Sequence, residues 1–178
     1  VRRQRQMCIR DSIRIAVPYT GMIISTRESE ECRERLLHLG VSQISGGSKT
    51  SVGGYFEPMP EKDDSAQFDV SDRRPLDEVI RWLMELGYLP SFCTACYGSG
   101  RTGDRFMEIC KDQQIHNFCH PNAIMTLKEY LEDYASPETR SVGEKLIARE
   151  VQTLENAKIK ETVEEDLIKI HNLSLIHI

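Results

Sequence analysis

Short apolar runs and one polar helix alternate in the first part of the chain. The runs at residues 21–25 and 41–45 are apolar and bounded by glycine, which is typical of buried strands. Residues 30–39 between them predict a helix, with Ser29 as its N-cap and Gly40 just beyond its end. Strand, helix and strand in this order predict a βαβ unit, and therefore two parallel strands.

The second part of the chain has helical periodicity. Residues 76–86 predict an amphipathic helix with five apolar side chains on one face: Leu76, Val79, Ile80, Leu83 and Met84. Thr126-x-x-Glu129 has the spacing of a capping box and predicts that a helix begins there. Ser136 followed by proline predicts the start of another helix, which runs to about residue 156. Residues 163–170 predict a last short helix.

Glycine, proline and charged residues gather between these two parts, at residues 52–68. We therefore expect one region at 13–55 and a second at 56–172. The two ends of the chain, residues 1–12 and 173–178, can be back-translated into partly complementary DNA, as the ends of library-preparation adapters would be. We interpret both ends as translated adapter and exclude them from functional reasoning.

Composition limits the classes of function. The chain has 23 Lys and Arg against 28 Asp and Glu, a formal net charge of −5, which argues against a nucleic-acid footprint. It has no apolar run of 18 residues, so no membrane span is expected. Outside the two ends, the odd number and wide spacing of the cysteines argue against a disulfide framework and fit the reducing cytoplasm. Cys32 and Cys110 are interpreted as buried small apolar residues.

The remaining cysteines form the most distinctive motif. Cys93 and Cys96 are a C-x2-C pair, and Cys119 follows after 22 intervening residues, with His120 beside it. Three thiolates of this kind can anchor an iron–sulfur cluster. The same spacing, with His120 as a fourth ligand, is also compatible with a closed structural zinc site. Spacing alone leaves both interpretations open.

The residues around the cysteines resemble a known family. Residues 93–97 (CTACY), 100–107 (GRTGDRFM) and 117–123 (NFCHPNA) resemble the C-terminal cluster motif of the HydG family, and the resemblance extends over about 13–154. HydG proteins are radical-SAM tyrosine lyases that mature [FeFe]-hydrogenase. Gly98 departs from the motif where a basic residue is expected. The fold that the resemblance implies is α/β: the C-terminal end of a radical-SAM (βα) barrel at 13–55, followed by a mainly helical cluster domain at 56–172.

The resemblance also implies chemistry for the full-length protein. One [4Fe–4S] cluster cleaves S-adenosylmethionine, and the resulting radical breaks tyrosine into p-cresol and dehydroglycine. The second, auxiliary [4Fe–4S] cluster, held by Cys93, Cys96 and Cys119, converts dehydroglycine to carbon monoxide and cyanide. Three cysteines leave one of its irons open to substrate or to an extra iron. Other hydrogenase maturation proteins are the implied partners.

Substrate recognition is expected at the end of the first predicted strand. In a βα barrel the functional residues follow the carboxyl ends of strands, here Ser25 and Arg27. The resemblance implies that Arg27 holds the tyrosine carboxylate. The plain alternative is a salt bridge of Arg27 at the barrel rim.

One spacing is absent from the sequence. The C-x3-C-x2-C motif that holds a SAM-cleaving cluster does not occur in these 178 residues. We therefore expect the chain by itself to be an inactive fragment that proteases cut near residues 52–71. Two alternatives stay open: a ThiH-type 2-iminoacetate synthase, which stops at dehydroglycine, and a zinc-stabilised domain without catalysis.

Overall fold

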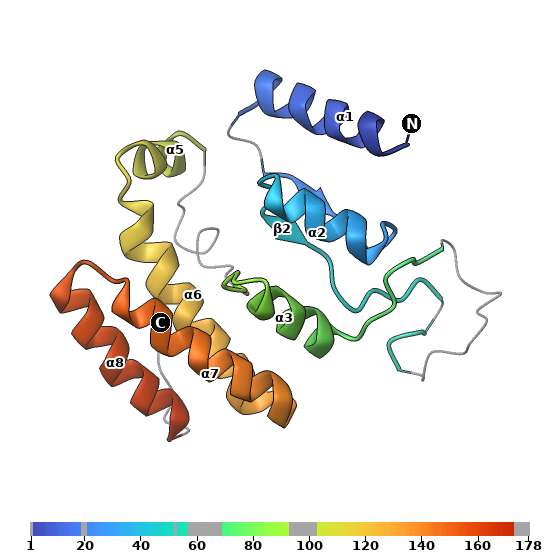
Figure 1. The fold of residues 1–178 in the computed structure, drawn as a ribbon. Helices are drawn as coiled ribbons and strands as arrows, with labels where there is room; N and C mark the ends of the chain where they lie inside the picture. The colour runs from blue at the N-terminus through green and yellow to red at the C-terminus, as the bar shows by residue number, and fades with distance from the viewer. Residues whose placement is uncertain (1, 19–20, 52, 57–68, 93–102, 173–178) are drawn as a thin grey trace. The chain divides into compact units, whose positions relative to one another are not determined.

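The computed structural model describes residues 2–18, 21–51, 53–56, 69–92 and 103–172. These residues divide into two compact units, Val1–Pro75 and Leu76–Ile178. Figure 1 shows strands and helices in the first unit and helices in the described part of the second. In the described part of the chain, no helix is both long and apolar enough to cross a membrane.

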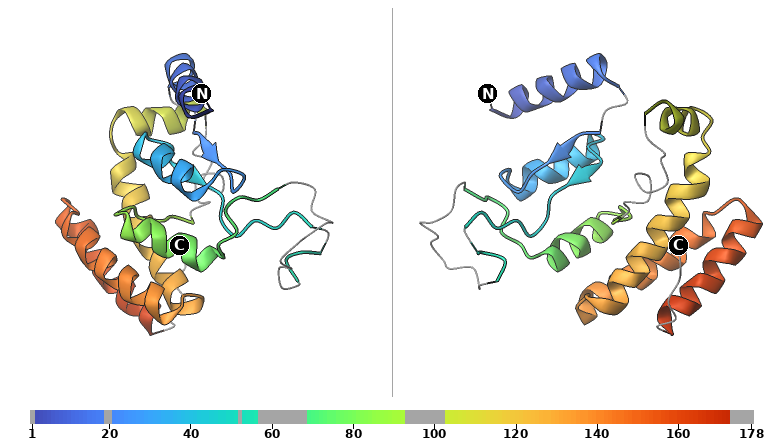
Figure 2. Two further views of the ribbon diagram at one scale, coloured as in Figure 1. Left: turned by 45° about the vertical axis from the view of Figure 1, so that its right-hand side comes forward. Right: turned by 180° about the vertical axis from the view of Figure 1, so that it is seen from behind.

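The first unit contains the βαβ element that the sequence predicts. β1 (Ile23–Ile24) and β2 (Gln43–Ile44) are parallel, and α2 (Glu30–His38) connects them. The backbone N–H of Ser45 donates to the Ile24 carbonyl at 3.0 Å, which extends the ladder past β2. α2 runs along the two strands (Figures 1 and 2), and its Cys32 and Leu37 are buried. The predicted parallel pairing is therefore confirmed.

Two turn positions explain where α2 begins and ends. Ser29 has the extended backbone of an N-cap, as predicted, but its side chain makes no capping hydrogen bond. Gly40 has φ +89°, a left-handed conformation that residues with a Cβ atom adopt at a cost, so it ends the helix as expected.

Helix α1 (Arg2–Ala16) covers the stretch that was interpreted as adapter at 1–12. Three of its isoleucines, Ile9, Ile13 and Ile15, are exposed, so its described apolar side chains bury little surface. Its described contacts to the rest of the unit include the hydrogen bonds that Arg10 and Arg14 donate to the carbonyls of Leu39 and Gly40. The adapter origin of 1–12 stays a prediction.

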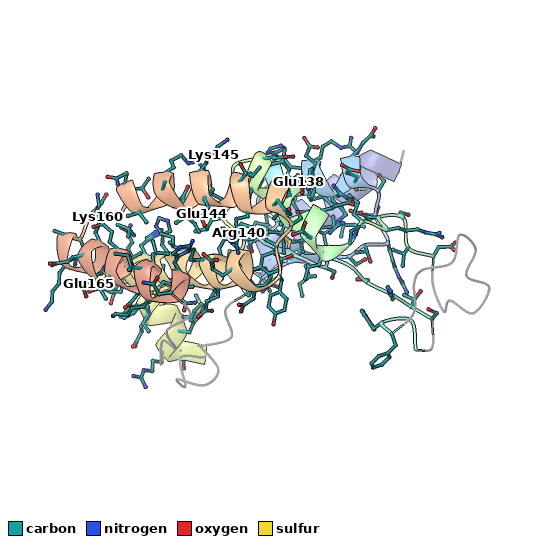
Figure 3. All side chains as sticks on the ribbon, turned by 90° about the horizontal axis from the view of Figure 1, so that it is seen from below. Glu138, Arg140, Glu144, Lys145, Lys160 and Glu165 are labelled. Atoms are coloured by element: carbon teal, nitrogen blue, oxygen red, sulfur yellow. The ribbon has the colours of Figure 1, made fainter. Side chains whose placement is uncertain are left out.

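Five helices make up the described part of the second unit: α3 (Leu76–Glu85), α5 (Gly103–Lys111), α6 (Ile115–Asp133), α7 (Pro137–Gln152) and α8 (Ala157–His171). α7 and α8 pack on α6, and α3 packs on α7 (Figure 2). Their shared core consists of nine buried side chains: Ile80, Met84, Ile124, Leu127, Leu131, Leu146, Ile147, Val151 and Val163. Charged side chains project from the other faces of α7 and α8 (Figure 3).

The predicted helix starts have different outcomes. α7 begins after Ser136, whose hydroxyl accepts a hydrogen bond from the Thr139 N–H at 3.3 Å, as the sequence predicts. The capping box at Thr126 is wrong, because α6 already begins at Ile115 and contains Thr126 in its interior. There the Thr126 hydroxyl donates to the Ala123 carbonyl at 3.3 Å instead of capping a helix. The last helix is also longer than predicted and begins after Asn156.

Candidate functional site

The end of β1 carries the residues predicted to bind substrate. Ser25 and Arg27 are both exposed, and the Arg27 backbone N–H donates to the Ser25 hydroxyl at 3.3 Å. Thr26 between them is only 3% exposed. The strand end therefore holds a buried residue flanked by two side chains that are open to solvent.

A segment from later in the chain fixes this strand end. The backbone N–H groups of Ser71 and Asp72 both donate to the Thr26 carbonyl at 3.0 Å. On the neighbouring strand, Arg33 of α2 donates to the carbonyl of Ser45, directly after β2. Hydrogen bonds from two other segments therefore hold the backbone just beyond both strands.

Arg33 and Asp72 form a buried ion pair beneath these contacts. The side chains of Arg33 and Asp72 are 0% and 2% exposed, and Nη1 of Arg33 donates a hydrogen bond to Oδ2 of Asp72. Arg74 donates three more hydrogen bonds to Asp72, two from its side chain at 2.9 and 2.7 Å and one from its backbone N–H at 3.2 Å, and its side chain also reaches Glu30. Burial by itself would raise the pKa of Asp72, but the hydrogen bonds and charges of Arg74 and Arg33 hold that pKa below its usual value.

Sequence reasoning missed this ion pair, although one signal was present. Arg33 directly follows Cys32, and both are on the face of α2 that the structure buries. A cation on a buried helix face requires a carboxylate partner, because an unpaired buried charge is strongly unfavourable. Nothing in the local sequence indicates that this partner is Asp72, which lies 39 residues away.

The predicted cluster ligands are divided between described and undescribed parts of the chain. Cys93 and Cys96 lie outside the described residues. Cys119 is exposed on the first half of α6. Within the described ranges, no group of three or more His, Cys, Asp or Glu side chains is arranged to hold a metal ion.

The residue that directly precedes Cys93 is described, and it contacts the same helix as Cys119. The ring of Phe92 stacks on the ring of Tyr130 of α6, with centroids 5.1 Å apart and an interplanar angle of 18°. Phe92 and Cys119 are therefore both associated with α6, although Tyr130 and Cys119 are eleven residues apart along it.

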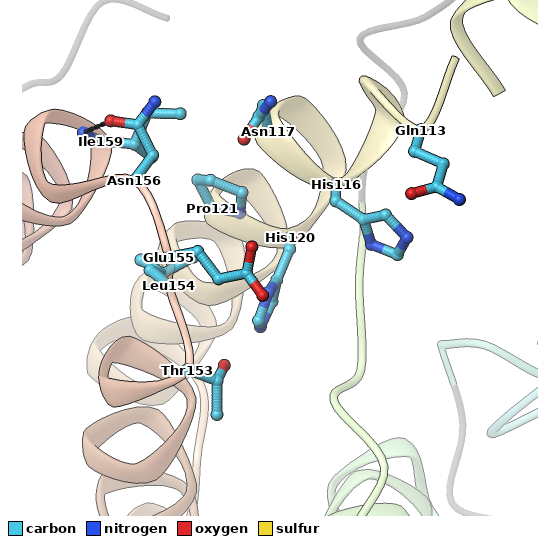
Figure 4. A pocket seen from close by; sticks show the side chains of 10 residues that line it. All are labelled: Gln113, His116, Asn117, His120, Pro121, Thr153, Leu154, Glu155, Asn156 and Ile159. Atoms are coloured by element: carbon cyan, nitrogen blue, oxygen red, sulfur yellow. Dashed lines mark hydrogen bonds between the residues drawn. The ribbon is translucent and has the colours of Figure 1, made fainter. Parts of the chain in front are cut away.

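His120, the alternative zinc ligand, has another partner. Its Nε2 lies 3.0 Å from Glu150 Oε2 of α7. His120 also lines a polar pocket between the start of α6 and the connection from α7 to α8, with His116, Asn117 and Glu155 (Figure 4). Cys119 is exposed and is not one of the residues that line this pocket.

A protein-family model matches the first part of the chain. Residues 5–89 match the model of the Biotin and Thiamin Synthesis associated domain, abbreviated BATS. This match covers the βαβ unit and α3.

Two solved structures resemble most of the chain. A crystal structure of HydG, a maturase of the [FeFe]-hydrogenase, is 50% identical, with a TM-score of 0.83 over 93% of this chain. The HydG structure from Carboxydothermus hydrogenoformans is 36% identical, with a TM-score of 0.62 over 87% of this chain. The chain spans only 35% and 31% of the length of these two proteins.

Curated relatives match over shorter stretches. The 2-iminoacetate synthase of Escherichia coli (strain K12) is 38% identical over 64 residues, which are 36% of this chain and 16% of that protein. The same enzyme of Salmonella typhimurium is 33% identical over 79 residues, or 44% of this chain and 20% of that protein. The resemblance to HydG is thus confirmed, and it extends over much more of the chain than the resemblance to 2-iminoacetate synthase.

Proposed function

We propose, from its similarity to HydG over nearly its whole length, that this chain is the C-terminal part of a radical-SAM tyrosine lyase for [FeFe]-hydrogenase maturation. The full-length enzyme cleaves tyrosine to p-cresol and dehydroglycine and converts dehydroglycine to carbon monoxide and cyanide. This part contributes the auxiliary cluster site and the last βα units of the barrel. S-adenosylmethionine cleavage belongs to a second cluster whose C-x3-C-x2-C ligands do not occur in these 178 residues.

Cys93, Cys96 and Cys119 hold the auxiliary [4Fe–4S] cluster. The observation that carries this assignment is the C-x2-C-x22-C spacing in a chain that is 50% identical to HydG over 93% of its length. Of the three cysteines, Cys119 is described, and it is exposed on α6. When bound, the cluster supplies an iron without a protein thiolate, at which small molecules can coordinate. His120 takes no part, because Glu150 already engages its imidazole at 3.0 Å.

Arg27 and Ser25 recognise the substrate at the end of β1. Both side chains are exposed there, and the guanidinium of an arginine offers parallel N–H donors that match a carboxylate. The Thr26 carbonyl between them accepts two hydrogen bonds from Ser71 and Asp72, which restrains the backbone on both sides of it. Arg27 therefore starts from a fixed backbone position when it binds the carboxylate of tyrosine.

A 2-iminoacetate synthase is the second candidate, because the curated relatives with this name are 38% and 33% identical. Such an enzyme stops at dehydroglycine and needs no auxiliary cluster. The cysteine motif at 93–119 favours the HydG type. A zinc-stabilised domain without catalysis is the remaining alternative, and the 3.0 Å contact of His120 Nε2 with Glu150 weighs against His120 as its fourth ligand.

A chimera tests the proposal. The N-terminal part of a HydG protein is joined to this chain from residue 13 onward, and the products from tyrosine and S-adenosylmethionine are measured without oxygen. We expect both p-cresol and carbon monoxide, and we expect Cys119→Ala to retain p-cresol while carbon monoxide falls to background. Formation of p-cresol without carbon monoxide by the unmodified chimera would favour the 2-iminoacetate synthase type instead.

A further inference from the structure

A chain of hydrogen bonds connects the segments that follow the two strands. Arg33 of α2 donates to the carbonyl of Ser45, directly after β2, and also to the carboxylate of Asp72. The backbone N–H of Asp72 in turn donates to the Thr26 carbonyl at 3.0 Å, two residues after the end of β1. Arg33 and Asp72 therefore join the backbone beyond β2 to the backbone beyond β1.

These two residues are buried, but they hold the backbone next to an exposed one. The side chains of Arg33 and Asp72 are 0% and 2% exposed, so neither is open to a substrate. Arg27 is exposed, and it directly follows Thr26, whose carbonyl accepts the Asp72 hydrogen bond. The Arg27 backbone N–H also donates to the Ser25 hydroxyl at 3.3 Å. Hydrogen bonds that begin in the interior thus fix the backbone from which the Arg27 side chain starts.

A buried ion pair is a poor device for stability alone. Moving two charges out of water costs about as much as their attraction returns, and well-packed apolar side chains of similar volume are often at least as stabilising. Apolar contacts do not fix directions, whereas a hydrogen bond weakens steeply when donor and acceptor lose their alignment. The planar guanidinium of Arg33 donates in fixed directions, so it sets the position of Asp72 relative to the Ser45 carbonyl.

We propose that Arg33 and Asp72 are positioning residues for substrate recognition: together they hold the Thr26 carbonyl, and with it the backbone from which Arg27 reaches the substrate carboxylate. This inference rests on the proposed role of Arg27 and adds two interior residues to it. A displacement of about 1 Å at a substrate-positioning group can cost about a hundredfold in rate, so small shifts of this backbone matter.

The chimera of a HydG N-terminal part with this chain provides the test, with the KM for tyrosine and the KM for S-adenosylmethionine measured separately. Asp72→Asn keeps the size of the side chain but removes its charge. Arg33→Lys keeps the charge but replaces the planar fork by a single ammonium group. We expect each variant to raise the KM for tyrosine about ten to one hundred times and to leave the KM for S-adenosylmethionine unchanged. Arg35→Lys, the same substitution at an exposed position of α2, is the matched control and should change neither constant.

A double substitution separates positioning from folding. If Asp72 acts through Arg27, adding Asp72→Asn to Arg27→Ala should raise the KM for tyrosine no further than Arg27→Ala alone. A role in folding alone would instead reduce the share of active enzyme, which lowers kcat and leaves the KM for tyrosine as it was.

The outcomes distinguish this inference from the proposed function. An unchanged KM for tyrosine in Asp72→Asn and Arg33→Lys would overturn the inference and leave the proposed function intact. A further increase when Asp72→Asn is added to Arg27→Ala would do the same, because Asp72 would then act elsewhere. If Arg27→Ala alone left the KM for tyrosine unchanged, the proposed role of Arg27 would be wrong, and the inference with it.

Discussion

The imidazole of His120 lies 3.0 Å from the carboxylate of Glu150, which joins α6 to α7 beside the polar pocket. The side chains are 25% and 17% exposed, so the pair is partly shielded from solvent. Cys119, the adjacent residue, is exposed and does not line that pocket. Cys119 is exposed, whereas His120 is partly buried against Glu150. The proposed three-cysteine cluster, unlike a zinc site with Cys and His, needs no ligand from His120.

Replacement of His120 by alanine should leave the cluster in place. We expect His120→Ala to keep the iron content and the spectrum of the reconstituted chain. The lost contact with Glu150 should reduce the free energy of unfolding by about 1 kcal/mol. Cys119→Ala is the matched comparison, because it changes the adjacent residue and should remove the iron. A parallel loss of metal in both variants would make His120 a ligand.

A network of charges joins the ends of α6, α7 and α8. Lys128, 6% exposed, contacts Glu132 at 2.7 Å and Glu144 at 2.5 Å, and Glu132 also contacts Arg140 at 2.9 Å and His171 at 2.8 Å. Burial alone would raise the pKa of Glu132, but the hydrogen bonds from Lys128 and His171 and the charge of Arg140 lower it to about 2. Folding thus favours the ionised form of Glu132.

This pKa predicts how the stability of the second unit depends on pH. Because the folded pKa of Glu132, about 2, lies below its ordinary value of 4.5, the stabilisation is complete above pH 4.5 and is lost as pH falls toward 2. Glu132→Gln should remove this part of the pH dependence of stability. At neutral pH it should lower the free energy of unfolding by about 2 kcal/mol, because it weakens hydrogen bonds to charged groups. Unfolding by urea at pH 7 and pH 3 measures both effects. If the free energy of unfolding differs between pH 7 and pH 3 by the same amount in Glu132→Gln as in the unmodified chain, this pH dependence does not come from Glu132.

Gly143 allows α7 to approach α6 closely. A Cβ atom built at this position would lie 2.5 and 2.6 Å from the two methyl groups of Leu131, which is 0% exposed. Alanine in a helix is favoured over glycine by about 1 kcal/mol, but overpacking a core costs about 1–3 kcal/mol.

We therefore expect Gly143→Ala to lower the thermal midpoint, although it improves helix propensity. Ser141→Ala, at an exposed position of the same helix, is the control and should leave the midpoint nearly unchanged. Combining Gly143→Ala with Leu131→Ala should cost less than the sum of the two single changes, because the clash is then relieved. If Gly143→Ala alone raises the thermal midpoint, the Leu131 side chain can move away from the new methyl group at little cost.

Asp72→Ala should disrupt the strand region of the first unit. It leaves the buried Arg33 guanidinium without its carboxylate, and breaking one side of a buried ion pair costs about 3–5 kcal/mol. Hydrogen exchange of the amides at 23–26 and 43–45 should accelerate strongly. Glu31→Ala, an exposed charge at the start of α2, is the comparison and should leave those amides protected. Equal protection in both variants would mean that the Arg33–Asp72 pair is dispensable.

Local signals predicted much of the fold, and distant contacts account for what was missed. Gly40 and the serine before Pro137 mark helix limits by their own conformations, so α2 and the start of α7 were predictable. Thr126 was misinterpreted because α6 continues through Pro121, where burial against neighbouring helices outweighs the lost backbone hydrogen bond. The partner of Arg33 and the contact of Phe92 with Tyr130 both join segments more than 35 residues apart, which periodicity cannot indicate.

The iron and acid-labile sulfide content of the purified chain, reconstituted without oxygen, tests the central claim most directly. A [4Fe–4S] cluster held by Cys93, Cys96 and Cys119 predicts about four irons and four sulfides per chain. It also predicts loss of both in each of the three Cys→Ala variants. One zinc per chain, bound in preference to iron when both metals and sulfide are supplied, would contradict the claim.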